Sequence, residues 1–146
     1  MALLNYRTKI DPDKTATEIA KCLSMHGASA ILTDYTDGIL SAISFKIRLH
    51  QRELSFRLPC DWRPVLAVLE QQVRQGKIRR SAANDLQAVR TAWRIVKDWV
   101  EAQMALVETQ MVTTQQVFLP YAVMPDNRTL TEHIAENPQL LLGSGE

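Results

Sequence analysis

The chain has 146 residues, of which 46% are hydrophobic and 23% are charged, and its formal net charge is +1. This composition predicts a single packed domain over residues 1–146 and excludes a disordered chain. Two cysteines are too few for a disulfide framework. No stretch reaches the roughly 18 apolar residues that a membrane span requires, and the N-terminus lacks the apolar run of a signal peptide. We therefore expect a cytoplasmic protein that has no membrane partner.

The charge is divided along the chain. Residues 46–97 carry twelve Lys or Arg against four acids, a balance of +8. Residues 98–146 carry seven acids against one Arg, a balance of −6. A basic middle followed by an acidic end indicates either an anionic partner or a protein that pairs with itself.

The first predicted element is a short amphipathic helix over residues 12–26. Asp11 is a suitable N-terminal cap, and Pro12 suits the first helical position. Gly27 is well placed to end the helix.

An antiparallel sheet follows this helix. Side chains that alternate between two faces along the chain predict strands over 31–35, 39–48 and 53–58. Asp37-Gly38 is a preferred two-residue turn, and the polar region 49–51 supplies a second turn. The sequence therefore predicts a three-stranded meander.

The same alternation assigns side chains to the two faces of the predicted sheet. One face carries six apolar side chains that need covering by helices: Ile43, Phe45, Ile47, Leu54, Phe56 and Leu58. Strict alternation places Leu40 on the opposite face, together with the bases Lys46, Arg48 and Arg57. Part of the basic charge is therefore expected on an open sheet face.

Two further helices are expected after the sheet. Asp61 is a candidate cap for the first of them, which Gly76 ends before a basic connection at 77–80. From Ser81, a plausible cap, to about Met111 there is no Gly or Pro, and the apolar arc is wider than one surface-facing stripe requires. We expect this long helix to form the central core element or to be shared with a subunit interface.

A small C-terminal appendage, residues 120–146, is expected beside a core of about residues 5–119. Residues 117–121 indicate an extended segment, and Thr129 with Glu132 fits the capping box of a last short helix. The leucines at 140–142 are expected to dock on this subunit or on another. The predicted fold is thus α+β: a short N-terminal helix, a three-stranded antiparallel meander, two helices (the second long) packed on one sheet face, and this appendage.

Catalysis and metal binding have little support in the sequence. Cys22 and His26 have the spacing of two ligands on a helix, but their residue types also suit an apolar stripe and a helix C-terminus. Asp34 and Asp37 flank a turn and lack the alternating oxygen ligands of a calcium loop. Neither a phosphate-binding glycine loop nor a nucleophile elbow is present. We expect no catalytic residue, no metal and no cofactor.

The basic residues form the one set with a positive functional interpretation. Several of them fall on the sheet face, at the junction between the last two large helices, or on the long helix, where they are placed to contact phosphates. The candidate nucleic-acid-binding residues are Lys46, Arg48, Arg57, Arg74, Lys77, Arg79, Arg80, Arg90 and Arg94. The alternative is that these side chains solvate the surface, or pair with acids of the C-terminal part in the same or a neighbouring subunit.

A resemblance is carried by residues 93–105, WRIVKDWVEAQMA, followed by FLPY at 118–121. The chain resembles, over most of its length, a set of uncharacterised small proteins encoded by bacteriophages and other mobile elements. The resemblance implies an accessory protein in the cytoplasm of a bacterial host cell and carries no activity with it.

Together with the basic residues, this setting predicts a non-enzymatic accessory protein that binds DNA or RNA. The broad apolar arc and the leucine-rich tail favour a homo-oligomer. The alternative is an oligomeric interaction or inhibitor protein that binds a host protein or sequesters a small anionic ligand between subunits.

Overall fold

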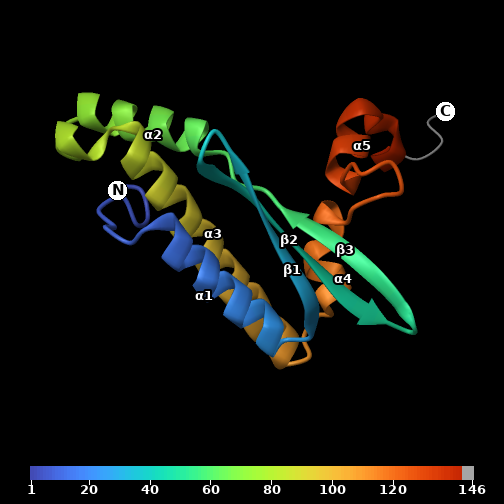
Figure 1. The fold of residues 1–146 in the computed structure, drawn as a ribbon. Coiled ribbons are helices and arrows are strands. Elements are labelled where there is room, and N and C mark those ends of the chain that lie inside the picture. Colours follow the sequence, from blue (N-terminus) through green and yellow to red (C-terminus); the bar gives the residue numbers. More distant parts are fainter. Residues whose placement is uncertain (143–146) are drawn as a thin grey trace.

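The computed structural model describes residues 1–142, which contain five α-helices and one three-stranded sheet. In chain order the elements are α1 (Pro12–Met25), β1 (Ala28–Thr36), β2 (Ile39–Leu49), β3 (Arg52–Leu58), α2 (Trp62–Arg74), α3 (Asp85–Glu108), α4 (Thr114–Phe118) and α5 (Leu130–Glu136). Three short 3₁₀ segments are η1 (Arg80–Ala82), η2 (Leu119–Tyr121) and η3 (Pro138–Leu141). Figure 1 shows α1 alongside α3, with α5 standing apart from this pair. None of the helices within residues 1–142 is long and apolar enough to cross a membrane.

The sheet is an antiparallel meander in the order β1-β2-β3, which confirms the predicted α+β class. Both turns use residues in the left-handed region: φ is 52° at Asp37 and 78° at Gly38, then 50° at His50 and 68° at Gln51. The pairs Ile43–Leu58, Phe45–Phe56 and Ile47–Leu54 lie directly opposite one another. The predicted apolar face is therefore also confirmed.

The position of Leu40 differs from the prediction because β2 contains a bulge. Tyr35 pairs with Leu40 and Asp34 pairs with Ala42, so that Ser41 has no partner on β1. The extra residue shifts the alternation by one, as bulges do, and brings Leu40 to the core face with an exposed fraction of 4%. Its carbonyl accepts a hydrogen bond of 3.1 Å from Trp93 Nε1. The assignment of Leu40 to the open face was wrong.

The main core lies between the apolar sheet face and the helices α1, α3 and α4. Phe45 stacks on Phe56 with ring centroids 5.3 Å apart, and Phe118 of α4 packs edge-on against Phe45. The helices α1 and α3 add large buried side chains: Ile19, Leu23, Trp93, Val100 and Met104. These rings and branched chains remove a continuous apolar surface from water, which is the main driving force for the fold.

The helix α2 has a different place from the one predicted. It packs along α3 and forms a second, smaller core around Leu69, Ile78 and Ala88. The helix that covers the sheet together with α3 is α1, because the apolar stripe of α1 is buried against both. Trp62 at the start of α2 packs against both cores, so this end of α2 also contacts the main core.

Local capping decides where the later elements begin. The predicted caps Asp11, Asp61 and Thr129 all accept hydrogen bonds from backbone N–H groups. The long helix begins after Asn84 instead of Ser81, because Asn84 Oδ1 accepts from Gln87 N at 2.8 Å. The extended segment predicted at 117–121 is helical instead, since a capping box at Thr113 starts α4.

The appendage is attached to the outer edge of β3. Val123 N donates to Ser55 O at 2.8 Å, and Phe56 forms an isolated antiparallel bridge with Ala122. Leu140, Leu141 and Leu142 are 62%, 71% and 75% exposed, so they do not dock on their own subunit. Their docking on another subunit stays a prediction, and the last four residues of the predicted appendage lie outside the described residues.

Candidate functional site

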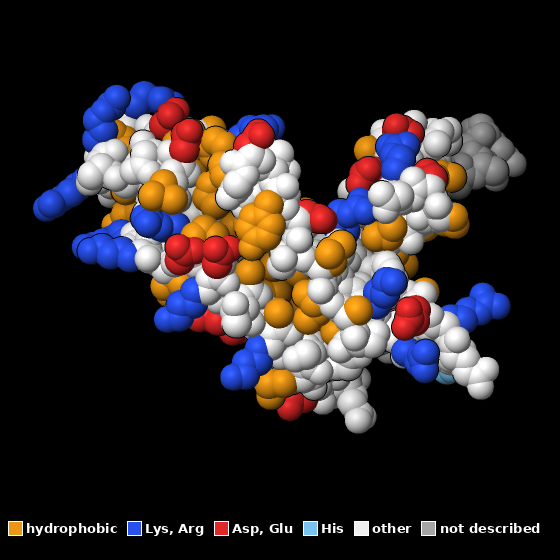
Figure 2. Space-filling view, viewed as in Figure 1, with side chains coloured by type: hydrophobic (Ala, Val, Ile, Leu, Met, Phe, Trp, Pro, Cys, Tyr) orange, Lys and Arg blue, Asp and Glu red, His pale blue; other side chains and the backbone are white. Residues whose placement is uncertain are grey.

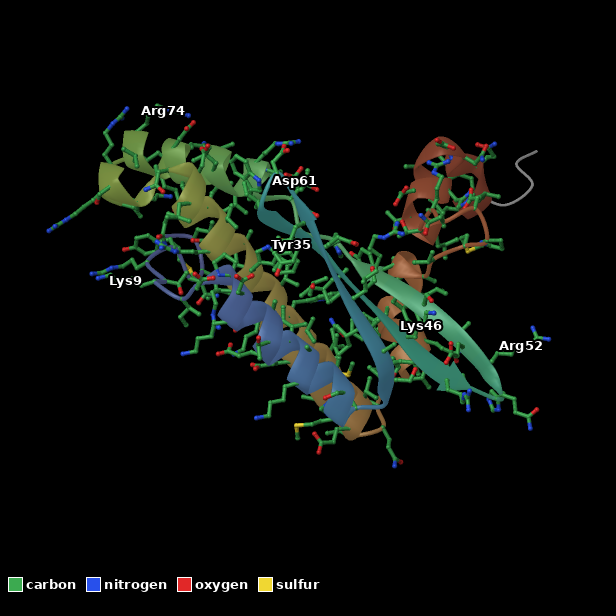
Figure 3. All side chains as sticks on the ribbon, viewed as in Figure 1. Lys9, Tyr35, Lys46, Arg52, Asp61 and Arg74 are labelled. Carbon is green, nitrogen blue, oxygen red and sulfur yellow. The ribbon has the colours of Figure 1, made fainter. Side chains whose placement is uncertain are left out.

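The nine candidate basic residues do not form one surface. Lys46, Arg48 and Arg57 lie on the open sheet face, whereas five others lie around the connection between α2 and α3: Arg74, Lys77, Arg79, Arg80 and Arg90. Figure 3 shows Arg74 at one end of the molecule and Lys46 well away from it, on the sheet. Arg94 belongs to neither group. We therefore treat the two groups as separate surfaces.

The connection between α2 and α3 borders a hollow of about 780 Å³, here called the junction hollow. Five of its lining residues are cationic, and none is acidic: Arg7, Lys9, Lys77, Arg79 and Arg90 carry the charge. Arg74 and Arg80 are exposed at the end of α2 and in η1. Figure 2 shows Lys and Arg side chains gathered at this end of the molecule. We call the seven residues Arg7, Lys9, Arg74, Lys77, Arg79, Arg80 and Arg90 the basic junction.

Hydrogen bonds hold the N-terminal segment against the basic junction. Gln87 Nε2 donates to Tyr6 O at 2.9 Å and to Thr8 O at 2.7 Å. At the other end of the segment, Leu3 N donates to Gln72 Oε1 at 3.0 Å. These bonds from α2 and α3 place Arg7 and Lys9 on the hollow. Sequence analysis missed both residues, because no local pattern indicates that the segment folds back over the α2–α3 connection.

Arg90 has an unusual environment for a basic residue near the surface. It lies in the second turn of α3, between η1 and the N-terminal segment, and is half-buried on the wall of the hollow. Its Nε is completely buried and has no hydrogen-bond partner in the structure. Among residues 1–142 it is the one buried side-chain N or O atom in that condition. A buried donor without an acceptor is costly to the folded state, and the other part of the Arg90 side chain lines the hollow.

The sheet group is less purely cationic than the basic junction. Arg57 donates to the carbonyl and side-chain oxygens of Asn127, at 3.2 and 3.0 Å, and so ties β3 to the appendage. Lys46 and Arg48 are exposed, but Arg48 lies directly opposite Glu53 in the sheet. A hollow of about 420 Å³ beside Lys46 and Arg57 has mostly apolar or small uncharged walls. This face has fewer free cations to offer to an anion.

Arg94 and its neighbour Lys97 take part in pairs within the helical layer. Arg94 Nη1 donates to Glu18 and Thr15 of α1, and its side chain is 13% exposed. Lys97 Nζ lies 2.9 Å from Glu101, one turn further along α3. Arg94 thus stabilises the packing of α1 on α3, and the structure does not bring it to the basic junction.

The described acids beyond α3 pair with bases of the appendage itself. Arg128 Nη1 donates to Glu136 at 2.7 Å and its Nε lies 3.5 Å from Glu132, while His133 Nε2 lies 3.0 Å from Asp126. A hydrogen bond from His133 lowers the pKa of Asp126 below its ordinary value. Of the nine candidate bases, only Arg94 lies within ion-pairing distance of an acid in residues 1–142. The acidic part of one chain therefore does not neutralise its basic junction.

The cysteines and histidines offer little to catalysis or metal binding. Burial raises the pKa of Cys60 to about 12, with a smaller contribution from Asp61, and burial also raises the pKa of Cys22. Both thiols are therefore protonated, and poorly nucleophilic, at neutral pH. His26 Nδ1 lies 2.7 Å from the carbonyl oxygen of Cys22, a backbone contact within α1. No group of three or more His, Cys, Asp or Glu that could hold a metal ion exists within residues 1–142.

The basic junction is therefore the site that the geometry favours: seven cations from three segments, a hollow without acids, and one buried donor that lacks an acceptor. Comparison with known proteins supplies no further guide to its ligand. No protein-family model, no curated protein and no solved structure matches this chain.

Proposed function

We propose that this protein is a non-enzymatic accessory protein that binds the phosphate backbone of nucleic acid through the basic junction. The observation that carries the proposal is the concentration of five cationic residues, with no acid, on the lining of one hollow. The setting implied by the resemblance, an accessory protein of a bacteriophage or mobile element in a bacterial cell, forms part of the same proposal.

The chemistry of the basic junction suits phosphate groups. Arginine presents a planar fork of donors that matches phosphate oxygens, and five of the seven residues of the basic junction are Arg: Arg7, Arg74, Arg79, Arg80 and Arg90. Cations on a nucleic-acid-binding surface release counterions from the phosphate backbone when they bind. Such binding depends steeply on salt and weakly on base sequence.

The geometry also indicates that recognition is of the backbone and not of bases. The exposed cations sit on the last turn of α2, on η1 and on an irregular N-terminal segment. No helix within residues 1–142 carries a row of them suited to entering a groove, as base-reading helices require. We therefore expect similar affinity for oligonucleotides of different base sequence.

A salt-series binding assay tests this function. Fluorescence anisotropy with labelled single-stranded DNA, duplex DNA and RNA is measured between about 50 and 200 mM salt, a range over which six to ten phosphate contacts cost a factor of roughly 10³–10⁵ in affinity. We expect affinity to fall linearly on logarithmic axes, with a slope of about −0.9 per phosphate contact on duplex DNA. Binding that is unchanged across the series, or absent at the lowest salt, contradicts the proposal.

A second candidate function is favoured by a different hollow, of about 430 Å³, between α1, the β1–β2 turn and the start of α3. Its walls are largely apolar, with Leu86 55% and Tyr35 53% exposed, and three carboxylates border it: Asp11, Asp13 and Asp85. This surface suits a basic and apolar partner: a host protein, or the basic junction of another copy in an oligomer.

Light scattering at micromolar concentration distinguishes the two possible partners of this hollow, a host protein and another copy of the chain. An assembly that dissociates as salt rises supports pairing between copies. A monomer at all salt concentrations excludes that pairing and leaves a host protein as the partner of this hollow.

A further inference from the structure

Three separate segments of the chain surround the junction hollow. The N-terminal segment contributes Tyr6, Arg7 and Lys9, the connection contributes Lys77 and Arg79, and α3 contributes Arg90. Cations therefore reach the hollow from several sides, as in a cup. A flat basic surface is the arrangement expected for a backbone that passes across it, whereas a cup suits a group at the end of a molecule.

Arg90 adds a half-buried cation to the wall of this cup. Its Nε is buried and unpaired, and the residue lines the hollow. Arg commonly binds a phosphate with two parallel N–H donors. A ligand with several oxygens on one phosphorus atom provides acceptors for the part of the Arg90 guanidinium that lines the hollow and for the neighbouring cations at the same time.

A terminal phosphate meets these conditions better than an internal one. A phosphomonoester carries a charge of about −1.5 to −2 at pH 7 and has three strong acceptor oxygens. An internal phosphodiester carries a single charge, and its chain must enter and leave the hollow. At about 780 Å³ the hollow is within the size range of small-molecule sites, which is roughly 300–1,000 Å³. It has room for a nucleotide, and Tyr6, which also packs against the second core, lies on its wall.

We propose that the junction hollow binds the terminal phosphomonoester of a nucleic-acid strand, with Arg90 as its central ligand. This inference rests on the proposed nucleic-acid binding and adds a preference for strand ends. The surrounding exposed cations, Arg74 and Arg80, then contact the adjoining backbone. The protein would thereby mark or protect phosphorylated ends without any chemical step.

The test compares labelled single strands that differ only at their ends. Three oligonucleotides of one sequence carry a 5′-phosphate, a 3′-phosphate or hydroxyls at both ends, with the label attached internally. We expect one phosphorylated strand to bind the wild-type protein about tenfold more tightly than the hydroxyl strand, since charge-assisted hydrogen bonds are the strong ones. A free nucleoside monophosphate is added as competitor, and we expect it to displace the phosphorylated strand at millimolar concentration.

Two variants test whether the preference for phosphorylated ends depends on the junction hollow. Arg90→Gln removes the charge on the wall of the hollow, and Arg48→Gln removes the same charge from the open sheet face. We expect Arg90→Gln to abolish the preference for phosphorylated ends and Arg48→Gln to preserve it. Because Arg90 is half-buried, the exposed Lys9→Ala is a second test at the hollow, with exposed Lys46→Ala as its charge-matched control. Circular dichroism checks that each variant is folded.

The outcomes separate this inference from the function on which it rests. Equal affinity for all three strands with a steep salt dependence overturns the inference and leaves backbone binding in place. Retention of the preference in both Arg90→Gln and Lys9→Ala also overturns it, because the end is then bound elsewhere. Failure to bind any strand at low salt overturns the proposed function and the inference together.

Discussion

Removing Arg79 and Arg80 provides the sharpest test of where nucleic acid binds. Both side chains are exposed, and neither makes a side-chain hydrogen bond or ion pair within residues 1–142, so their loss leaves the packing of the domain intact. If each neutralises one phosphate, the double variant Arg79→Ala/Arg80→Ala lowers the salt slope by about 1.8 on duplex DNA and about 1.4 on a single strand. At about 0.1 M salt this corresponds to a loss in affinity of roughly 60-fold on duplex DNA.

The matched control is Lys46→Ala/Arg48→Ala on the open sheet face. Both double variants change the formal net charge from +1 to −1, so a difference between them reports position and not total charge. Anisotropy titrations at four or more salt concentrations give the slope for each protein. We expect a slope change for the junction variant alone. An equal change in both variants would show that the proposed location is wrong, and no change in either would show that neither pair of cations contacts phosphate.

Three further predictions concern stability and reactivity. Trp93→Phe leaves the buried carbonyl of Leu40 without its donor, so we expect a loss of about 1–3 kcal/mol in the free energy of unfolding by urea, beyond any cavity cost. Because burial raises the pKa of Cys60 to about 12, its thiol should react with a disulfide reagent at pH 8 far more slowly than in urea; equal rates would contradict its burial. Hydrogen bonds lower the folded-state pKa values of Asp126, Glu132 and Glu136 below their ordinary 3.8, 4.5 and 4.5. Their stabilising effect is therefore present above about pH 4.5 and lost as pH falls through the lowered folded values, so carboxyl signals of these three residues followed by NMR should titrate below their ordinary pKa values; midpoints at or above those values would contradict the hydrogen bonds.

Much of the fold could be predicted from local signals. Asp37-Gly38 requires a left-handed turn, and alternation in β2 and β3 assigns the core face correctly from Ile43 onward. The error at Leu40 has a physical cause: a bulge at Ser41 depends on pairing with β1, and the sequence of β2 alone does not reveal it. The position of α2 was likewise missed, because amphipathic character indicates that a helix is buried on one side but not against which element.

The candidate site was partly predictable for similar reasons. Lys77, Arg79 and Arg80 are close in sequence and so remain close in space. Arg7 and Lys9 reach the same hollow only through long-range hydrogen bonds from Gln87, which no spacing in the sequence indicates. The sequence also groups Arg90 with Arg94 on one polar face of the long helix, because they are four residues apart, but the structure gives them different environments. The first faces the hollow, whereas the second pairs with Glu18.

The order of charges along the sequence suggests that the acidic end could neutralise the basic middle. In the folded chain it does not neutralise the basic junction. The sign changes within α3, where Arg94 and Lys97 already have acidic partners. The described acids beyond α3 form ion pairs with Arg128 and His133 in the appendage. The basic junction therefore keeps its charge although the whole chain is nearly neutral, at +1. Since exposed charges are screened beyond about 8 Å at physiological salt, an anion near the hollow responds to the seven local cations and not to the total.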